Sequence, residues 1–214
     1  DGRPVAVQVY PGNTADPTTV PDQVEKLRDR FGLERVTLVG DRGMLTQTQI
    51  DKLRAFPGLS WISALRSKSI NALVNGGSLQ LSLFDERDLA EITSPLFPGE
   101  RLIACYNPAL AAKRKRKREE LIAATEKQLG RIAAETARRS KTPLNKAEIG
   151  LKVGRVINSH KVAKHFKVTI SDGHFSFARR QDAIAREAAL DGIYVIRTSE
   201  PAERLTAEDA VRGY

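Results

Sequence analysis

The 214-residue sequence contains a single cysteine, Cys105, so no internal disulfide bond can form. This agrees with the reducing conditions of a cytoplasm, where we expect the protein to reside. Cys105 lies in the apolar run 102–106, which predicts a buried structural thiol. No apolar run approaches the ~18 residues that a membrane-spanning helix requires. The sequence therefore favours a protein without a membrane-embedded part.

The chain opens with Asp1-Gly2, which is typical of a turn and is not an initiator methionine. We therefore expect the chain to be a piece of a longer protein. Hydrophobic residues make up 41% of it, which predicts a globular chain and not a disordered one. Its length suits one large domain or two small ones.

The net charge of +9 is placed unevenly along the chain. Residues 101–167 hold 18 Lys and Arg against 5 Glu and no Asp, an excess of +13, whereas the rest of the chain carries −4. A localised basic segment indicates a polyanionic partner. Nucleic acid is the commonest partner of this kind, and an anionic membrane surface is the second choice.

The first 65 residues read as alternating strands and helices. We predict strands at 3–10, where Val5, Val7 and Val9 alternate, at 35–40 and at 59–65. Helices are predicted at 20–31, closed by Gly32, and after Thr46, which has the character of an N-cap. This order predicts an α/β unit with parallel strands.

Different patterns follow in the rest of the chain. A strand is predicted at 101–106, and Asn107-Pro108 begins a helix that continues to about Arg139. Asp172-Gly173 separates two alternating runs, which is a strong hairpin signal. A final strand is predicted at 193–198.

Asp41 is the first candidate for chemistry. It directly follows the predicted strand 35–40, at the end where α/β sheets place their ligands. Gly40 and Gly43 beside it allow close approach of the backbone, and a carboxylate there suits Mg²⁺ or Mn²⁺. The alternative interpretation is an ordinary Asp in a strand-to-helix turn.

The basic residues supply a second group of candidates. Six consecutive cations begin the long helix, and we consider each a candidate for contact with DNA or RNA: Lys113, Arg114, Lys115, Arg116, Lys117 and Arg118. The alternative is a solvated helix start. Lys161, Lys164 and His165 form a smaller basic group, in which phosphate contact by His165 competes with an ordinary surface position or a metal role.

Six short motifs occur in order along nearly the whole chain. They are Pro11-Gly12-Asn13-Thr14-Ala15-Asp16, Val39-Gly40-Asp41-Arg42-Gly43-Met44, Pro98-Gly99-Glu100-Arg101-Leu102, Tyr106-Asn107-Pro108, Lys161-Val162-Ala163-Lys164-His165-Phe166 and Leu190-Asp191-Gly192-Ile193-Tyr194-Val195-Ile196. Together they resemble the DDE transposases of bacterial insertion sequences, in the branch whose catalytic domain is split by an insertion.

The resemblance implies a ribonuclease-H-like fold in which three acidic residues hold two Mg²⁺ (or Mn²⁺) ions. The second of these acids lies in a Gly-Asp-Arg-Gly pattern, so the resemblance assigns Asp41 to that role. Arg42 would orient the carboxylate or touch phosphate, with a structural salt bridge as the alternative. The first Asp and the last Glu of the family would lie outside this chain, so we expect the chain by itself to be inactive.

The resemblance also implies a division of the chain and a set of partners. Residues 1–66 and 190–214 would belong to the catalytic core, and residues 67–189 would form a basic insertion. The parent enzyme would cut and join double-stranded DNA at transposon ends and targets. The resemblance is also compatible with a homodimer on DNA. Two rivals remain: a ribonuclease-H-like nuclease without strand transfer, and a non-catalytic nucleic-acid-binding scaffold.

Overall fold

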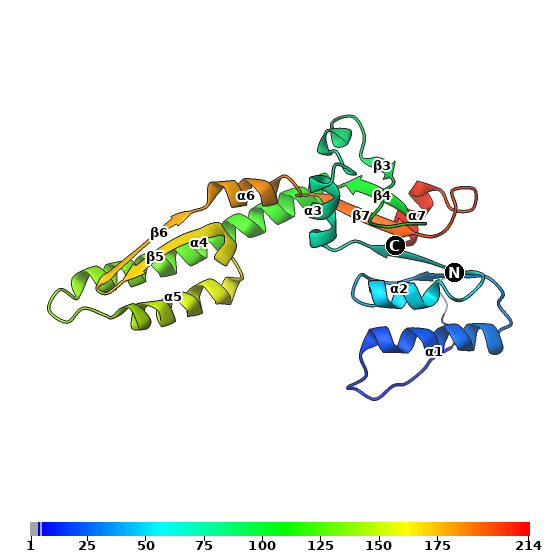
Figure 1. The fold of residues 1–214 in the computed structure, drawn as a ribbon, viewed down its shortest axis with the longest axis horizontal. Coiled ribbons are helices and arrows are strands. Elements are labelled where there is room, and N and C mark those ends of the chain that lie inside the picture. The colour runs from blue at the N-terminus through cyan, green and yellow to red at the C-terminus, as the bar shows by residue number, and fades with distance from the viewer. Residues whose placement is uncertain (1–3, 5) are drawn as a thin grey trace. The chain divides into compact units, whose positions relative to one another are not determined.

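The computed structural model describes residues 4 and 6–214, and the chain divides into two compact units. The first unit comprises residues up to Tyr106 together with Tyr194–Tyr214, and the second comprises Asn107–Ile193. The chain therefore leaves the first unit once, builds the second, and returns to the first (Figure 1).

The first unit contains a five-stranded sheet in the order β1-β2-β7-β4-β3. Its strands are β1 (Val36–Val39), β2 (Leu59–Ala64), β3 (Leu89–Ile92), β4 (Arg101–Tyr106) and β7 (Ile193–Thr198). β1 and β2 run parallel, whereas β7 runs antiparallel to β2 and β3 runs antiparallel to β4. The sheet is therefore mixed, and the predicted α/β class is confirmed.

Two helices pack near the β1 and β2 strands (Figure 1). They are α1 (Asp16–Asp29) and α2 (Gln47–Leu53), and their apolar residues bury Trp61 of β2 in a common cluster. Thr46 caps α2 by accepting a hydrogen bond from the Gln49 N–H, as predicted. Gly32 follows α1 with a φ of 63° and donates to the Arg28 carbonyl, which confirms the predicted C-terminal glycine.

A separate cluster joins the sheet to α7 (Ala207–Gly213). Ile62, Ile103 and Ile196 come from three strands of the sheet and pack with Ala210 of α7. Cys105 belongs to the same cluster and is 2% exposed, so the prediction of a buried thiol is confirmed. Burial raises the pKa of the Cys105 thiol to about 11, which makes it a poor nucleophile.

The predicted strand at 3–10 is wrong over the residues that the structure describes. Residues 6–10 form no strand, and the remainder of that prediction falls on Arg3 and Val5, which lie outside the described residues, and on Pro4. Val7 and Val9 are more than four-fifths exposed, so their alternation does not bury an apolar face. The next element, α1, begins four residues earlier than the predicted Val20 start, with Pro17 in its first turn.

Residues 67–106 belong to the first unit by their contacts. They contain α3 (Ser67–Asn75), the short 3₁₀ helix η1 (Leu81–Asp85), and the hairpin of β3 and β4, which extends the sheet. The sequence prediction grouped 67–106 with the insertion. The compact second unit, Asn107–Ile193, is smaller than the predicted insertion, 67–189. The division into catalytic core and insertion stays a prediction.

The second unit is built around the long helix α4 (Pro108–Arg138). It also contains α5 (Lys146–His160), the 3₁₀ turn η2 (Ala163–His165), the hairpin strands β5 (Phe166–Ser171) and β6 (His174–Arg179), and α6 (Gln181–Ala188). Asn107 caps α4 by accepting a hydrogen bond from the Leu110 N–H at 3.0 Å, as predicted. The predicted hairpin is confirmed, with Ser171 and His174 paired around its two-residue turn.

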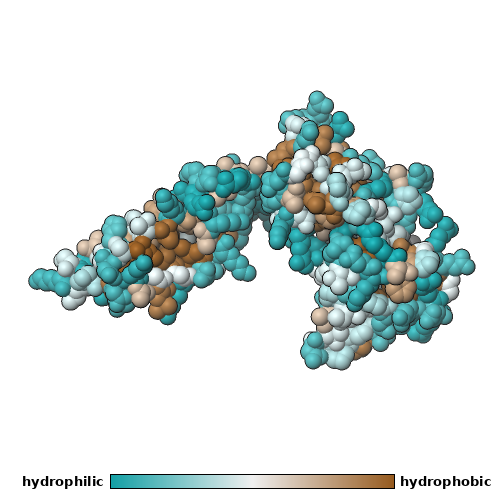
Figure 2. Space-filling model, in the orientation of Figure 1, coloured by the Kyte–Doolittle hydropathy of each residue, from teal (hydrophilic) through white to brown (hydrophobic). Residues whose placement is uncertain are grey.

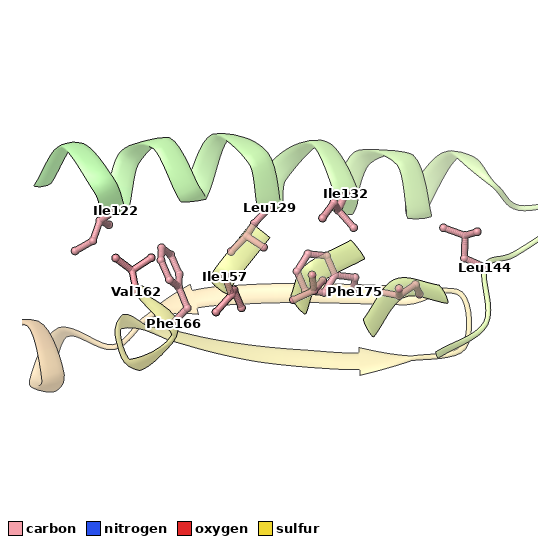
Figure 3. Close-up of a cluster of buried hydrophobic side chains, with 10 residues drawn as sticks. Ile122, Leu129, Ile132, Leu144, Ile157, Val162, Phe166 and Phe175 are labelled. Carbon is pink, nitrogen blue, oxygen red and sulfur yellow. The ribbon is translucent and has the colours of Figure 1, made fainter. Parts of the chain in front are cut away.

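One apolar core holds the second unit together. Ile122, Leu129 and Ile132 of α4 point toward Phe166 and Phe175 of the hairpin (Figure 3). Residues of α5 complete the cluster. The buried residues of α4 recur at steps of three and four, from Ile122 through Thr125 and Leu129 to Ile132, so one face of the helix is buried and the opposite face is left to solvent.

None of the helices in the described part of the chain is both long and apolar enough to cross a membrane. Hydrophilic residues cover most of the face drawn in Figure 2, and hydrophobic patches are small by comparison.

Candidate functional site

Asp41 lies just beyond the C-terminal end of β1. The parallel pairing of β1 and β2 continues one step further, because the Gly40 N–H donates to the Ile62 carbonyl at 3.1 Å. The C-terminal ends of both strands therefore meet at one edge of the sheet, with Asp41 following β1 and Arg66 following β2. The edge beyond the C-terminal ends of parallel strands is where α/β folds bind ligands.

The loop around Asp41 needs glycine on both sides. A Cβ at Gly40 would lie 2.8 Å from Cγ of Leu45, a side chain that is buried in the α1–α2 cluster. A Cβ at Gly43 would lie 3.1 Å from Oδ1 of Asp41 itself. The two glycines thus let the backbone fold tightly around the carboxylate.

The Asp41 carboxylate is exposed and held by its own loop. Oδ1 accepts hydrogen bonds from the backbone N–H groups of Met44 and Gly43, both at 2.7 Å. The Met44 bond and then the Gly43 bond lower the pKa of Asp41, and the charges of Arg42 and Arg66 lower it further. The carboxylate is therefore ionised at neutral pH, and Oδ2 accepts no hydrogen bond from any described residue.

Arg42 and Arg66 surround Asp41 with positive charge. The Arg42 side chain is exposed and forms no ion pair with any described residue, so its predicted roles in orienting Asp41 or touching phosphate stay predictions. Arg66 donates to the Arg42 carbonyl through Nε at 3.3 Å and Nη2 at 3.1 Å. Sequence reasoning missed Arg66, although its place directly after a strand parallel to β1 is a signal that could have found it.

Asp41 fits one ligand position of a hard divalent cation. It offers a charged oxygen whose second atom is open to solvent, and oxygen ligands suit Mg²⁺ and Mn²⁺. Among the described residues, no three His, Cys, Asp or Glu side chains gather as a metal-binding group. Asp41 is therefore a single candidate ligand.

The six cations at the start of α4 are not equivalent. Lys113, Lys115, Arg116 and Lys117 are exposed, and of these only Arg116 contacts a carboxylate of the described chain, Glu120 at 3.7 Å. Lys113, Lys115 and Lys117 are thus open to an external anion, and Arg116 is held only by this exposed pair.

Arg114 and Arg118 are engaged within the second unit. The Arg118 side chain is 8% exposed and makes a bidentate pair with Asp191, with N–O distances of 2.8 and 2.6 Å. Arg114 donates to the carbonyls of Leu190 and Ile193. Because these guanidinium groups hold the returning chain against α4, the candidates for DNA contact in the run reduce to the four exposed cations.

His165 is buried, so its interpretation as an ordinary surface histidine is wrong, and its contact with phosphate stays a prediction. It is 2% exposed, and its Nε2 lies 2.6 Å from Glu187 of α6. Lys164 pairs with the same carboxylate at 2.7 Å. Burial raises the pKa of Glu187, but the bonds from Lys164 and His165 outweigh it and the net shift is downward. Lys161 is exposed and forms no ion pair with any described residue.

The motif at residues 98–102 is part of the core of the first unit. Glu100 is fully buried and accepts two hydrogen bonds from Arg197, both at 2.6 Å, and one from Arg54 at 2.7 Å. The indole Nε1 of Trp61 lies 3.5 Å from the same carboxylate. Glu100 of this motif therefore has a structural role, joining Arg54, Arg197 and Trp61 in the first unit.

The family described as Transposase DDE domain matches residues 1–209. The chain belongs to this family. No curated protein and no solved structure matches the chain significantly. For this transposase DDE domain, the family match supports a role in transposition and a DNA substrate, and it agrees with the resemblance carried by the six motifs.

Proposed function

We propose that the parent of this transposase domain cleaves DNA at transposon ends and joins it to a target. The observation that carries the proposal is Asp41: an ionised, solvent-facing carboxylate at the C-terminal edge of a parallel strand pair, in a loop shaped by two glycines. The match to the transposase DDE domain supports the same assignment.

We assign Asp41 as one ligand of Mg²⁺ or Mn²⁺ in a ribonuclease-H-like core, with further acids outside residues 1–214. Such ions, when bound in a pair, activate the attacking hydroxyl and stabilise the leaving oxygen. Asp41 contributes a negative charge that is already in place, because the Met44 and Gly43 N–H groups hold Oδ1 and leave Oδ2 open. Arg42 and Arg66 add positive charge that attracts the phosphate backbone.

In this proposal the second unit binds the DNA. Lys113, Lys115, Arg116 and Lys117 contact phosphates without reading base sequence, and Lys161 and Lys164 add to the same electrostatic attraction. Because the affinity for DNA is distributed over many cations, DNA binding should not depend on a single carboxylate such as Asp41.

The test of this function is an assay on the full-length parent. With a labelled transposon end and Mg²⁺ we expect both a cut 3′ end and a product joined to target DNA. A chelator should abolish both products, and Mn²⁺ should restore them. Residues 1–214 alone, as a control, should not nick plasmid DNA.

The same assay separates the two rivals. Cleavage without any joined product would support a nuclease that lacks strand transfer. Binding without cleavage would support a non-catalytic scaffold, and nicking by residues 1–214 alone would contradict the assignment of the missing acids to sequence outside the chain.

Binding of DNA by the second unit can be tested separately. We expect replacement of Lys113, Lys115, Arg116 and Lys117 by Gln to make the negative slope of log affinity against log salt less steep. The magnitude of the slope should fall by roughly 2 if half of the four residues touch phosphate and by about 3.6 if all four do. Gln retains helix propensity, and Arg114 and Arg118 stay in place to hold the fold. Titrations at several salt concentrations measure the slope, and an unchanged value would leave the run a solvated helix start.

A further inference from the structure

The outer face of α4 carries cations far beyond the six-residue run. The buried face of this helix is marked by Ile122, Thr125 and Leu129. Successive residues of an α-helix are rotated by about 100°. On that basis the residues opposite the buried face include five cations, all of them exposed: Lys113, Arg116, Lys127, Arg131 and Arg138. We call these five residues the α4 basic stripe.

The stripe is not neutralised by the protein itself. Among the described residues, no carboxylate lies within 4.0 Å of the charged groups of Lys113, Lys127, Arg131 or Arg138. Arg116 pairs with Glu120 at 3.7 Å, but both side chains are more than 60% exposed, so the pair contributes little.

Two acids on the flanks of α4 are paired with other elements of the second unit. Glu126 forms an ion pair with Arg179 of β6. Glu135 pairs with Lys152 of α5 at 2.6 Å. Ala123 and Ala134 lie between the cations of the stripe on the exposed face. The stripe is therefore a row of exposed positive charge, interrupted on the same face by Glu120, which pairs weakly with Arg116.

The spacing of the stripe matches the repeat of duplex DNA. Arg116, Lys127 and Arg138 follow one another at intervals of eleven residues, which is close to three full turns, so they drift by only about 20° per interval. At 1.5 Å per residue the distance from Arg116 to Arg138 is ~33 Å. One turn of DNA is about 34–36 Å long.

We infer that the α4 basic stripe lies lengthwise on duplex DNA over about one helical turn and touches phosphates at both ends and in the middle. This inference rests on the proposed function, since it specifies how the second unit holds the DNA. It extends the contact some 20 residues beyond the basic run, to the far end of α4.

Two features of α4 favour duplex DNA over other polyanions. A helix that binds a membrane surface presents an apolar face to the lipid, but the apolar face of α4 is buried in the core of the second unit (Figure 3). Proteins that grip single strands stack bases on aromatic side chains, and α4 contains no Phe, Tyr or Trp. What the stripe offers is charge alone, which suits a regular phosphate backbone.

The test uses the whole chain and a triple variant outside the run, with Lys127→Gln, Arg131→Gln and Arg138→Gln. Fluorescence anisotropy with a duplex of about 24 base pairs measures affinity at several salt concentrations. We expect the slope of log affinity against log salt to fall by about 2.7, at 0.9 for each lost contact. The matched control removes three exposed cations of the same unit that lie off α4, with Lys146→Gln, Arg155→Gln and Arg180→Gln, and its slope should stay near that of the wild type.

Duplex length supplies a second readout. The wild type should gain affinity sharply between duplexes of about 6 and 12 base pairs, because only the longer one spans the stripe, and the triple variant should lose that gain. An equal fall in slope for both variants, or an unchanged slope for the stripe variant, would overturn the inference while leaving DNA binding intact. A wild type that binds no duplex at low salt, or that prefers phosphatidylserine vesicles, would overturn the inference together with the proposed DNA grip.

Discussion

Replacing Asp41 by Ala in the full-length parent should abolish both cleavage and joining of DNA. A metal ion contributes several kcal/mol to the stabilisation of the transition state, so loss of one of its charged ligands should reduce the rate at least ~10³-fold. Asp41→Asn should be equally inactive. Its side-chain oxygen can still accept the Met44 and Gly43 N–H bonds, so the loop stands while the charge is lost.

Binding and cleavage must be measured separately in these variants. DNA affinity should stay within about threefold of the wild type, because it depends on distributed cations. Asp51→Asn is a suitable control, since Asp51 is an exposed acid on α2 that accepts a hydrogen bond from the Gln47 side chain. Transposition that survives in Asp41→Ala would remove Asp41 from the active site.

The buried charges of the first unit should produce the largest effect on stability. Glu100→Ala leaves Arg197 in the core without its carboxylate, and Arg197 is only 6% exposed at its side chain. Removal of one partner from a buried pair costs about 3–5 kcal/mol. For a chain of this size we expect a fall in Tm of roughly 10 °C.

Trp61 makes this prediction easy to follow. It is the only tryptophan of the chain, is 2% exposed, and lies beside Glu100, so its fluorescence during urea denaturation reports on the first unit. The double variant Glu100→Leu with Arg197→Met should recover part of the loss, since it removes both buried charges, and Arg54, which also loses its Glu100 partner, is 35% exposed at its side chain. Arg212→Gln breaks an exposed pair with Asp209 within the first unit and should cost under about 1 kcal/mol. A similarly small cost for Glu100→Ala would contradict the role of the network.

Local patterns predicted most elements of the fold correctly. The Asn107-Pro108 start of α4, the cap at Thr46 and the hairpin at Asp172-Gly173 all depend on residues adjacent in sequence, so the sequence contains the whole cause. The strand at 3–10 failed because alternation produces a strand only when another strand accepts its hydrogen bonds. Residues 6–10 have no such partner among the described residues.

At the candidate site, too, some features depend on neighbouring residues in the sequence and others depend on tertiary structure. The sequence alone determined that Asp41 follows a strand between glycines, and that charge gathers in residues 101–167, since both are properties of neighbouring residues. Only tertiary structure decided which charges remain available. Asp191 lies 73 positions from Arg118 and Glu187 lies 22 from His165, yet folding brings each acid against its partner and withdraws both basic groups from solvent. The orientation of α4 on its core selects the face whose cations stay exposed, because burial of the apolar stripe leaves only the opposite side to meet a ligand.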